Sequence, residues 1–163
     1  METTFRPLEA PDFEAVKSIY NYYVLNSTAT FHTEPVTIAE LQETIAVNHP
    51  LYLAYIVEEA GKPVGFFYLS AYKKRQAYNR SAEFTLYLAH DYTSKGIGQK
   101  ILNFIEEKAQ NIGLKNLLAV ICAENTASIS LFKKNQYDQC AHFKNIGEKF
   151  DRVLDIVIYQ KEI

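Results

Sequence analysis

The sequence predicts a mixed α/β protein that folds as one domain around a largely antiparallel sheet. Two apolar, aromatic-rich runs, 51–57 and 64–69, are separated by a Gly/Pro turn, which is typical of a β-hairpin. The apolar runs 82–89 and 117–121 flank a helical pattern over 97–112, which is typical of a right-handed crossover between parallel strands. No repeat, low-complexity tract or linker divides the chain, so we expect one domain spanning all 163 residues.

The composition is that of an ordinary globular protein and argues against several classes of function. A formal charge of −2 disfavours a broad electrostatic grip on nucleic acid. No apolar run approaches the ~20 residues needed to cross a bilayer, so we expect no membrane association. Two cysteines and four scattered histidines predict neither a disulfide framework nor a metal site. Since the first residues lack a signal-like apolar stretch, we expect a cytoplasmic protein.

The first half of the chain carries a strand signal and two helix signals before the hairpin. A strand is predicted over 3–8, and Asp12 is a candidate cap for a helix whose apolar residues recur on one side up to Val24. The stretch 25–35 is polar and predicts a loop. Thr37 and Glu40 form a capping box that predicts the start of a second helix.

The second half predicts a long helix, a short helix and three strands. Apolar residues mark one face of 97–112, and Gly113 is a candidate helix stop. The run 117–121 is continuously apolar, which favours a strand buried on both faces. Asn125 can cap a short helix, and two final strands are predicted around 138–143 and 153–159.

A glycine pair in "TSKGIGQK" (93–100) marks the junction between strand 82–89 and the long helix. A helix start presents unpaired N–H groups and the positive end of the helix dipole, and glycine lets a phosphate approach them closely. The glycines could instead simply turn the chain. Ile101 stands where a dinucleotide fingerprint needs its third glycine, and the Walker pattern is absent. Among phosphate ligands, this leaves pantetheine cofactors with a pyrophosphate, meaning coenzyme A.

A family resemblance supports the coenzyme A interpretation. Residues 93–98 resemble the [RQ]-x-x-G-x-[GA] signature of the GCN5-related N-acetyltransferases (GNAT), and the element order does so over nearly the whole chain. Four further segments resemble the phosphinothricin and methionine sulfone acetyltransferase branch: "IYNYYVLNSTATFHTEP" (19–35), "KKRQAYNRSAEFTLYL" (73–88), "NTASISLF" (125–132) and "GEKFDRVLDIVIYQ" (147–160).

The resemblance implies a GNAT fold, with a mixed, mostly antiparallel sheet, flanking helices and one splayed parallel strand pair. Acetyl-CoA would be the cosubstrate, with its pantetheine lying between the splayed strands. The implied backbone contacts to pantetheine are at Leu86, Tyr87 and Leu88. The implied pyrophosphate amides are those of Ser94, Lys95, Gly96, Ile97, Gly98 and Gln99. Asn125 would hydrogen-bond the cofactor, a role compatible with a helix cap.

Acetyl transfer to an amine requires a base, an oxyanion donor and a way for the thiolate to leave. Glu83 lies in an otherwise apolar strand and matches the proposed catalytic glutamate of the branch, although it could merely face solvent. The match is weaker at the residue that would protonate the departing thiolate, because Phe132 stands where many relatives have Tyr and this branch often has His. Thr93 replaces the usual Arg or Gln, and Gln136–Tyr137 replace a Gly–Phe pair. Cys122 offers a less favoured acetyl-enzyme route.

The acceptor is expected to be a small amino-acid-like amine. A cationic segment such as 72–80 is in most proteins a solvated hairpin loop. The resemblance, however, places Lys73, Arg75 and Tyr78 near the substrate, where an arginine can clamp a carboxylate. It also implies that Phe31 and Glu34 border the acceptor and that the chain forms a homodimer. Two alternatives stay open: a catalytically weak module that binds acyl-CoA, and an acetyltransferase for a peptide N-terminus.

Overall fold

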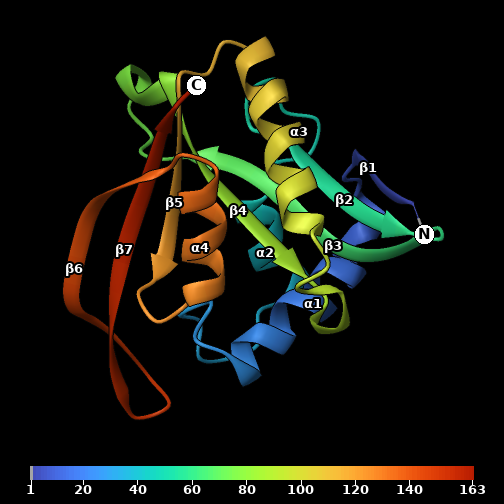
Figure 1. Cartoon of the computed structure of the whole chain (residues 1–163). Helices are drawn as coiled ribbons and strands as arrows, with labels where there is room; N and C mark the ends of the chain where they lie inside the picture. The colour runs from blue at the N-terminus through green and yellow to red at the C-terminus, as the bar shows by residue number, and fades with distance from the viewer. Residues whose placement is uncertain (1) are drawn as a thin grey trace.

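One seven-stranded sheet organises the computed structural model, which describes residues 2–163 (Figure 1). The strand order is β1-β2-β3-β4-β5-β7-β6, and every neighbouring pair is antiparallel except β4 and β5. The strands are β1 (Thr3–Pro7), β2 (Ala54–Glu59), β3 (Lys62–Ala71), β4 (Ser81–Leu88), β5 (Asn116–Cys122), β6 (Asp138–Lys149) and β7 (Arg152–Glu162). This arrangement confirms the predicted fold class.

Helices cover both faces of the sheet, because alternate side chains of the central strands are apolar on both sides. The helices are α1 (Phe13–Asn26), α2 (Ile38–Thr44), α3 (Ile97–Asn111) and α4 (Thr126–Lys134). Figure 1 shows α3 and α4 in front of the sheet and α1 and α2 behind it. One buried cluster packs Ile101 and Ile105 of α3 on Phe84, and the other packs α1 and α2 on Phe66 and Tyr68. Within residues 2–163, no helix is both long and apolar enough to span a membrane.

The parallel pair separates soon after it begins, and this split positions the site. β4 and β5 pair only at Ser81–Asn116, Ala82–Leu117 and Glu83–Leu118. Figure 1 shows the two strands diverging towards their carboxyl ends. Because β4 continues to Leu88 against β3 alone, its other edge is open to an extended ligand beyond Glu83.

Several local predictions are confirmed, but the predicted capping role of Asp12 is wrong. Thr37 and Glu40 form the capping box, and Gly113 ends α3 with φ +91°. The first α-helix begins directly after Asp12, but the Asp12 side chain does not cap it. Instead, both carboxylate oxygens of Asp12 accept hydrogen bonds from Arg6, at 2.7 and 2.8 Å.

The predicted strands near the carboxyl end were too short, and β5 is less buried than expected. β6 and β7 run well beyond 138–143 and 153–159 because they form a long hairpin that projects from the sheet (Figure 1). The prediction that strand 117–121 is buried on both faces was wrong, since Val120 is 42% exposed. Gln136 has φ +69°, the left-handed conformation that glycine adopts most easily.

Candidate active site

Glu83 lies at the point where β4 and β5 part. It alternates with Ala82 and Phe84, which are buried under α3, so its side chain faces the α1 and α2 side of the sheet. Burial raises the pKa of Glu83 above the ordinary value for a glutamate, because the charged form is poorly solvated there. A half-buried carboxyl with a raised pKa is well matched to accept a proton near neutral pH.

The glycine loop opens α3 as the sequence predicts. Gly96 is the N-cap residue with φ +77°, and no atom outside its chain neighbours lies within 4 Å of the position that a Cβ would take. Ser94 is also left-handed, with φ +60°. The N–H groups of the first turn, at Ile97, Gly98 and Gln99, have no intrahelical acceptor. The start of α3 can therefore receive an anion, and Lys95 stands beside it, 4.7 Å from the ring centre of Tyr92.

Gly98 has a packing role that is separate from ligand binding. A Cβ there would lie 3.0 Å from Leu131 Cδ2, so the absence of a side chain lets α3 approach α4. The Gln99 side chain joins the same helices, since its amide oxygen accepts from Asn135 Nδ2 at 2.9 Å. The first turn of α3 is therefore fixed against α4.

The start of α4 combines a helix cap with a donor that remains available. The Asn125 side-chain oxygen accepts from the Ser128 N–H at 3.2 Å, which confirms its predicted capping role. This leaves the Asn125 Nδ2 group as a donor at the carboxyl end of β5. Tyr23, reaching from α1, donates its hydroxyl to the Leu88 carbonyl at 2.5 Å, so one of the expected pantetheine contacts already has a protein partner.

Phe132 and Cys122 are both withdrawn from solvent. Phe132 is 5% exposed and packs edge-on against the rings of Phe84 and Tyr137, as a core residue does. It can donate no proton. Cys122, the last residue of β5, is 6% exposed, which disfavours it as a nucleophile.

A pocket of about 500 Å³ lies between the loop after α1, helix α2 and strand β3, and we call it the α1–α2 pocket. Its lining includes Tyr20, Phe31, Glu34, Glu40, Glu43 and Tyr68. Phe31 and Glu34, two of the predicted acceptor residues, are thus brought together. His32, expected to be a loop residue, contacts the Tyr20 hydroxyl through Nδ1, and that hydroxyl lies 2.6 Å from Thr30 Oγ1.

The β6–β7 hairpin holds the loop that carries Phe31. Lys149 is only 3% exposed, and its ammonium donates to the Thr30 carbonyl at 2.8 Å. Burial lowers the pKa of Lys149. Gly147 lies directly under the Phe31 ring, where a Cβ would come within 2.5 Å of Cε2.

An exposed ion pair lies at the same junction. Arg152 donates two hydrogen bonds to Glu124, at 2.8 and 2.9 Å, and Thr28 donates a third at 2.6 Å. These bonds, chiefly those from Arg152, lower the pKa of Glu124 to about 2.

The remaining predicted acceptor residues lie apart from the α1–α2 pocket. Lys73, Arg75 and Tyr78 are exposed on the β3–β4 connection, and Arg75 stacks over the Tyr78 ring at 6.0 Å. None of them lines the α1–α2 pocket. Along β3, the pocket residue Tyr68 comes first, then Ser70, which pairs with Glu83, and then the cationic loop. Glu83 therefore lies between the pocket and the cationic loop along the strand direction.

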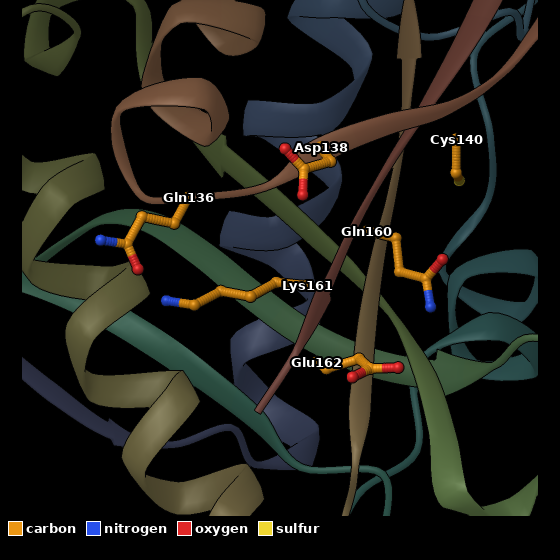
Figure 2. Close-up of a pocket in the computed structure, with 6 residues that line it drawn as sticks. All are labelled: Gln136, Asp138, Cys140, Gln160, Lys161 and Glu162. Atoms are coloured by element: carbon orange, nitrogen blue, oxygen red, sulfur yellow. The ribbon is translucent and has the colours of Figure 1, made fainter.

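A second hollow, of about 410 Å³, lies at the start of β6 and the end of β7, at the edge of the sheet (Figure 2). Polar side chains line it, with Gln136 and Lys161 at one end and Cys140 and Gln160 at the other (Figure 2). Neither the glycine loop nor Glu83 contributes to it. Within residues 2–163, no group of three or more His, Cys, Asp or Glu side chains could hold a metal ion.

Sequence reasoning missed the residues that shape the acceptor side. Tyr20 and Tyr68 looked like core aromatics, and Glu40 looked only like a capping residue. Gly147 and Lys149 were quoted only as part of a matching segment. No sequence signal marks Lys149, because its burial is seen only in the structure, although lysine is almost never fully buried without a partner.

Comparisons with known proteins agree with this geometry. The model of the acetyltransferase (GNAT) domain matches residues 5–158. The chain is 30% identical to the phosphinothricin N-acetyltransferase of Alcaligenes faecalis, over 98% of this chain and 82% of that protein. It is 27% identical to the L-methionine sulfoximine/L-methionine sulfone acetyltransferase of Pseudomonas aeruginosa, over 98% of this chain and 94% of that protein.

A solved structure of a GNAT superfamily phosphinothricin acetyltransferase from Sinorhizobium meliloti, in complex with acetyl-CoA, matches with a TM-score of 0.91. It is 28% identical, and the match covers all of this chain and 89% of that one. Fold, family model and relatives agree along nearly the whole chain, which therefore belongs to the GNAT family of N-acetyltransferases.

Proposed function

We propose that this protein transfers the acetyl group of acetyl-CoA to the primary amine of a small amino-acid-like acceptor, of the phosphinothricin, methionine sulfone or methionine sulfoximine type. The observation that carries the proposal is the position of Glu83. It is a half-buried base where β4 leaves β5, and it faces the side on which the α1–α2 pocket lies. The named relatives that act on such amino acids support this acceptor class.

The cosubstrate fits the open edge of β4 and the start of α3. The backbone of Leu86, Tyr87 and Leu88 would pair with pantetheine, and the amides from Ser94 to Gln99 would hold the pyrophosphate. The open space over Gly96 supports this placement. Among residues 2–163, Asn125 Nδ2 has no acceptor, so it can donate to the same ligand from the start of α4.

Acetyl-CoA supplies the acetyl group as an activated thioester. Glu83 takes a proton from the acceptor ammonium, directly or through water, because an ammonium has no lone pair and an α-amino group has a pKa of ~8. The freed nitrogen forms a bond to the carbonyl carbon while a backbone N–H of β4 stabilises the oxyanion. The carbon–sulfur bond then breaks and sulfur keeps the electron pair, while the nitrogen, positively charged after its attack, loses its second proton to water and leaves a neutral amide.

Water protonates the departing thiolate in this scheme. Phe132 occupies the position of a protein acid and is buried among aromatic rings. A thiol pKa of ~8.5 permits departure without a protein acid near neutral pH. The proposed transfer is direct, since the Cys122 thiol is buried.

Phe31 and Glu34 are proposed to border the acceptor, and Lys73, Arg75 and Tyr78 to face its carboxylate. Their positions on the two sides of Glu83 support this assignment. An arginine or lysine in this loop can pair with an α-carboxylate while Glu83 meets the α-amine.

We further propose a homodimer of single-domain chains in the cytoplasm. An exposed apolar surface on the β6–β7 hairpin supports self-association, since Phe143, Ile146, Phe150 and Val153 are 46–59% exposed. Both cysteines are free thiols, which suits a reducing compartment. Light scattering on the purified protein tests the dimer.

A catalytically weak module that binds acyl-CoA is the second candidate, and the burial of Phe132 favours it. A thiol-release assay with acetyl-CoA and a panel of amino acids separates the two. We expect turnover with at least one amino acid, and a loss of turnover in Glu83→Gln with unchanged acetyl-CoA binding by calorimetry. Binding without turnover would favour the module, and no binding at all would refute both.

A further inference from the structure

The α1–α2 pocket carries an unbalanced negative charge. Three carboxylates line it, those of Glu34, Glu40 and Glu43, and no lysine or arginine does. Glu40 Oε2 accepts from the Thr37 N–H at 3.0 Å as part of the capping box. Within residues 2–163, none of the three carboxylates forms an ion pair. The imidazole of His32 also lines the pocket, where its Nδ1 contacts the Tyr20 hydroxyl, so among residues 2–163 an entering cation would meet one histidine but no lysine or arginine in the lining.

The inner lining of the pocket is aromatic. Tyr20, Phe31, Phe66 and Tyr68 contribute to it, and the last two rings are stacked within 6° of parallel. The faces of aromatic rings attract cations, most strongly where water is excluded. Carboxylates at the rim and rings beneath them form the combination that binds an ammonium or guanidinium group.

Tyr68 links this pocket to the proposed base. It is only 9% exposed, and its hydroxyl interacts with the side chain of Thr85, its partner across the sheet. Burial raises the pKa of Tyr68, and the nearby Tyr20 and Glu83 add to this rise. The hydroxyl therefore stays protonated, and Tyr68 contributes to the pocket lining close to Glu83.

The register of the sheet sets the distance that a ligand must span. Tyr68 pairs with Thr85, and Ser70 pairs with Glu83, so the two positions differ by two residues along the strand. At ~3.4 Å per residue, this is about 7 Å. An acceptor nitrogen at Glu83 and a second group in the pocket would thus be separated by a chain of several bonds.

We propose that the α1–α2 pocket binds a second, cationic group of the acceptor, so that the acceptor class is basic amino acids. This inference rests on the proposed acetyl transfer to an amino-acid-like acceptor, but it favours a basic side chain over the phosphinothricin type named above. The α-amine meets Glu83, the cationic side chain enters the pocket, and the α-carboxylate points towards Lys73 and Arg75. An anionic side chain, such as the phosphinate of phosphinothricin, would face three carboxylates and be disfavoured.

Arginine and citrulline provide the matched test, because they have nearly the same shape and one reactive amine each. Only arginine carries a positive side chain, which stays charged at any workable pH. We expect kcat/KM at least tenfold higher for arginine than for citrulline, with phosphinothricin below both. In the double variant Glu34→Gln/Glu43→Gln, this preference should fall at least fivefold. Glu107→Gln, an exposed change on α3, should keep it.

Calorimetry separates failure of the inference from failure of the proposed function. If no acceptor is acetylated, the proposed function fails, but arginine should still bind more tightly than citrulline and lose that advantage in the double variant. Equal kcat/KM and equal affinity for arginine and citrulline would overturn the inference even in an active enzyme. A preference that survives in the double variant would also overturn it.

Discussion

Gly147→Ala is expected to damage acceptor use through Phe31, a residue that lies far from it in the sequence. An ideal Cβ at this position would be 2.5 Å from Phe31 Cε2 and 2.7 Å from Cδ2. Carbon atoms in contact prefer about 3.5–4.0 Å. The ring must therefore move by about 1 Å or more, or the hairpin must withdraw from the loop.

The size of the effect follows from this displacement. Overpacking a well-fitted contact costs roughly 1–3 kcal/mol, and a protein of this length loses about 2–4 °C in Tm per kcal/mol. A shift of about 1 Å at a substrate-positioning group can cost up to ~100-fold in rate. We therefore expect kcat/KM for the acceptor to fall ~10–100-fold, while the KM for acetyl-CoA stays unchanged because the start of α3 is untouched.

Steady-state thiol release with varied acceptor measures this effect. Phe31→Leu provides the matched background, because a smaller side chain leaves room for the new methyl group. Adding Gly147→Ala to Phe31→Leu should cost less than threefold further. The reasoning is refuted if Gly147→Ala has normal acceptor kinetics, or if its defect is equally large in the Phe31→Leu background.

Four further outcomes are expected. Glu83→Gln should lower kcat ~100-fold or more, because the variant lacks the base. The same variant should have a higher Tm at pH 7, since the raised pKa of Glu83 means that the ionised carboxylate opposes folding above that pKa. For the unmodified enzyme, the acid limb of the kcat/KM profile should lie above the ordinary glutamate pKa. Phe132→Ala should destabilise the protein by ~3–5 kcal/mol in urea unfolding, because it leaves a cavity in an aromatic cluster. Lys149→Met should raise the acceptor KM ~10-fold in thiol-release kinetics, because the Thr30 carbonyl loses its donor. Acetyl-CoA at ~100 times its Kd should stabilise the fold by ~2.7 kcal/mol, raising Tm in calorimetry by roughly 5–10 °C.

The sequence predicts the framework well because local signals and packing agree there. The capping box at Thr37 and the glycine stop at Gly113 were recovered because each depends on only a few neighbouring residues. Asp12 was misjudged because its carboxylate is taken by Arg6, a residue on a preceding strand.

The acceptor side was predicted only in part, for a related reason. Phe31 and Glu34 came from a resemblance, whereas the contacts of Gly147 and Lys149 with the loop join residues more than 100 positions apart. Such contacts depend on where a long hairpin packs, and no periodicity along the chain encodes that. The Glu83 pKa shift likewise depends on burial by distant segments.

The early parting of β4 from β5 has a consequence for the catalytic cycle. If pantetheine takes the place of the missing pairing, the ligand completes the sheet, and the two halves are otherwise joined at this seam by only three residue pairs. Departure of CoA then removes a strand-like ligand from the edge of β4, so each catalytic cycle ends by reopening the gap in the middle of the sheet.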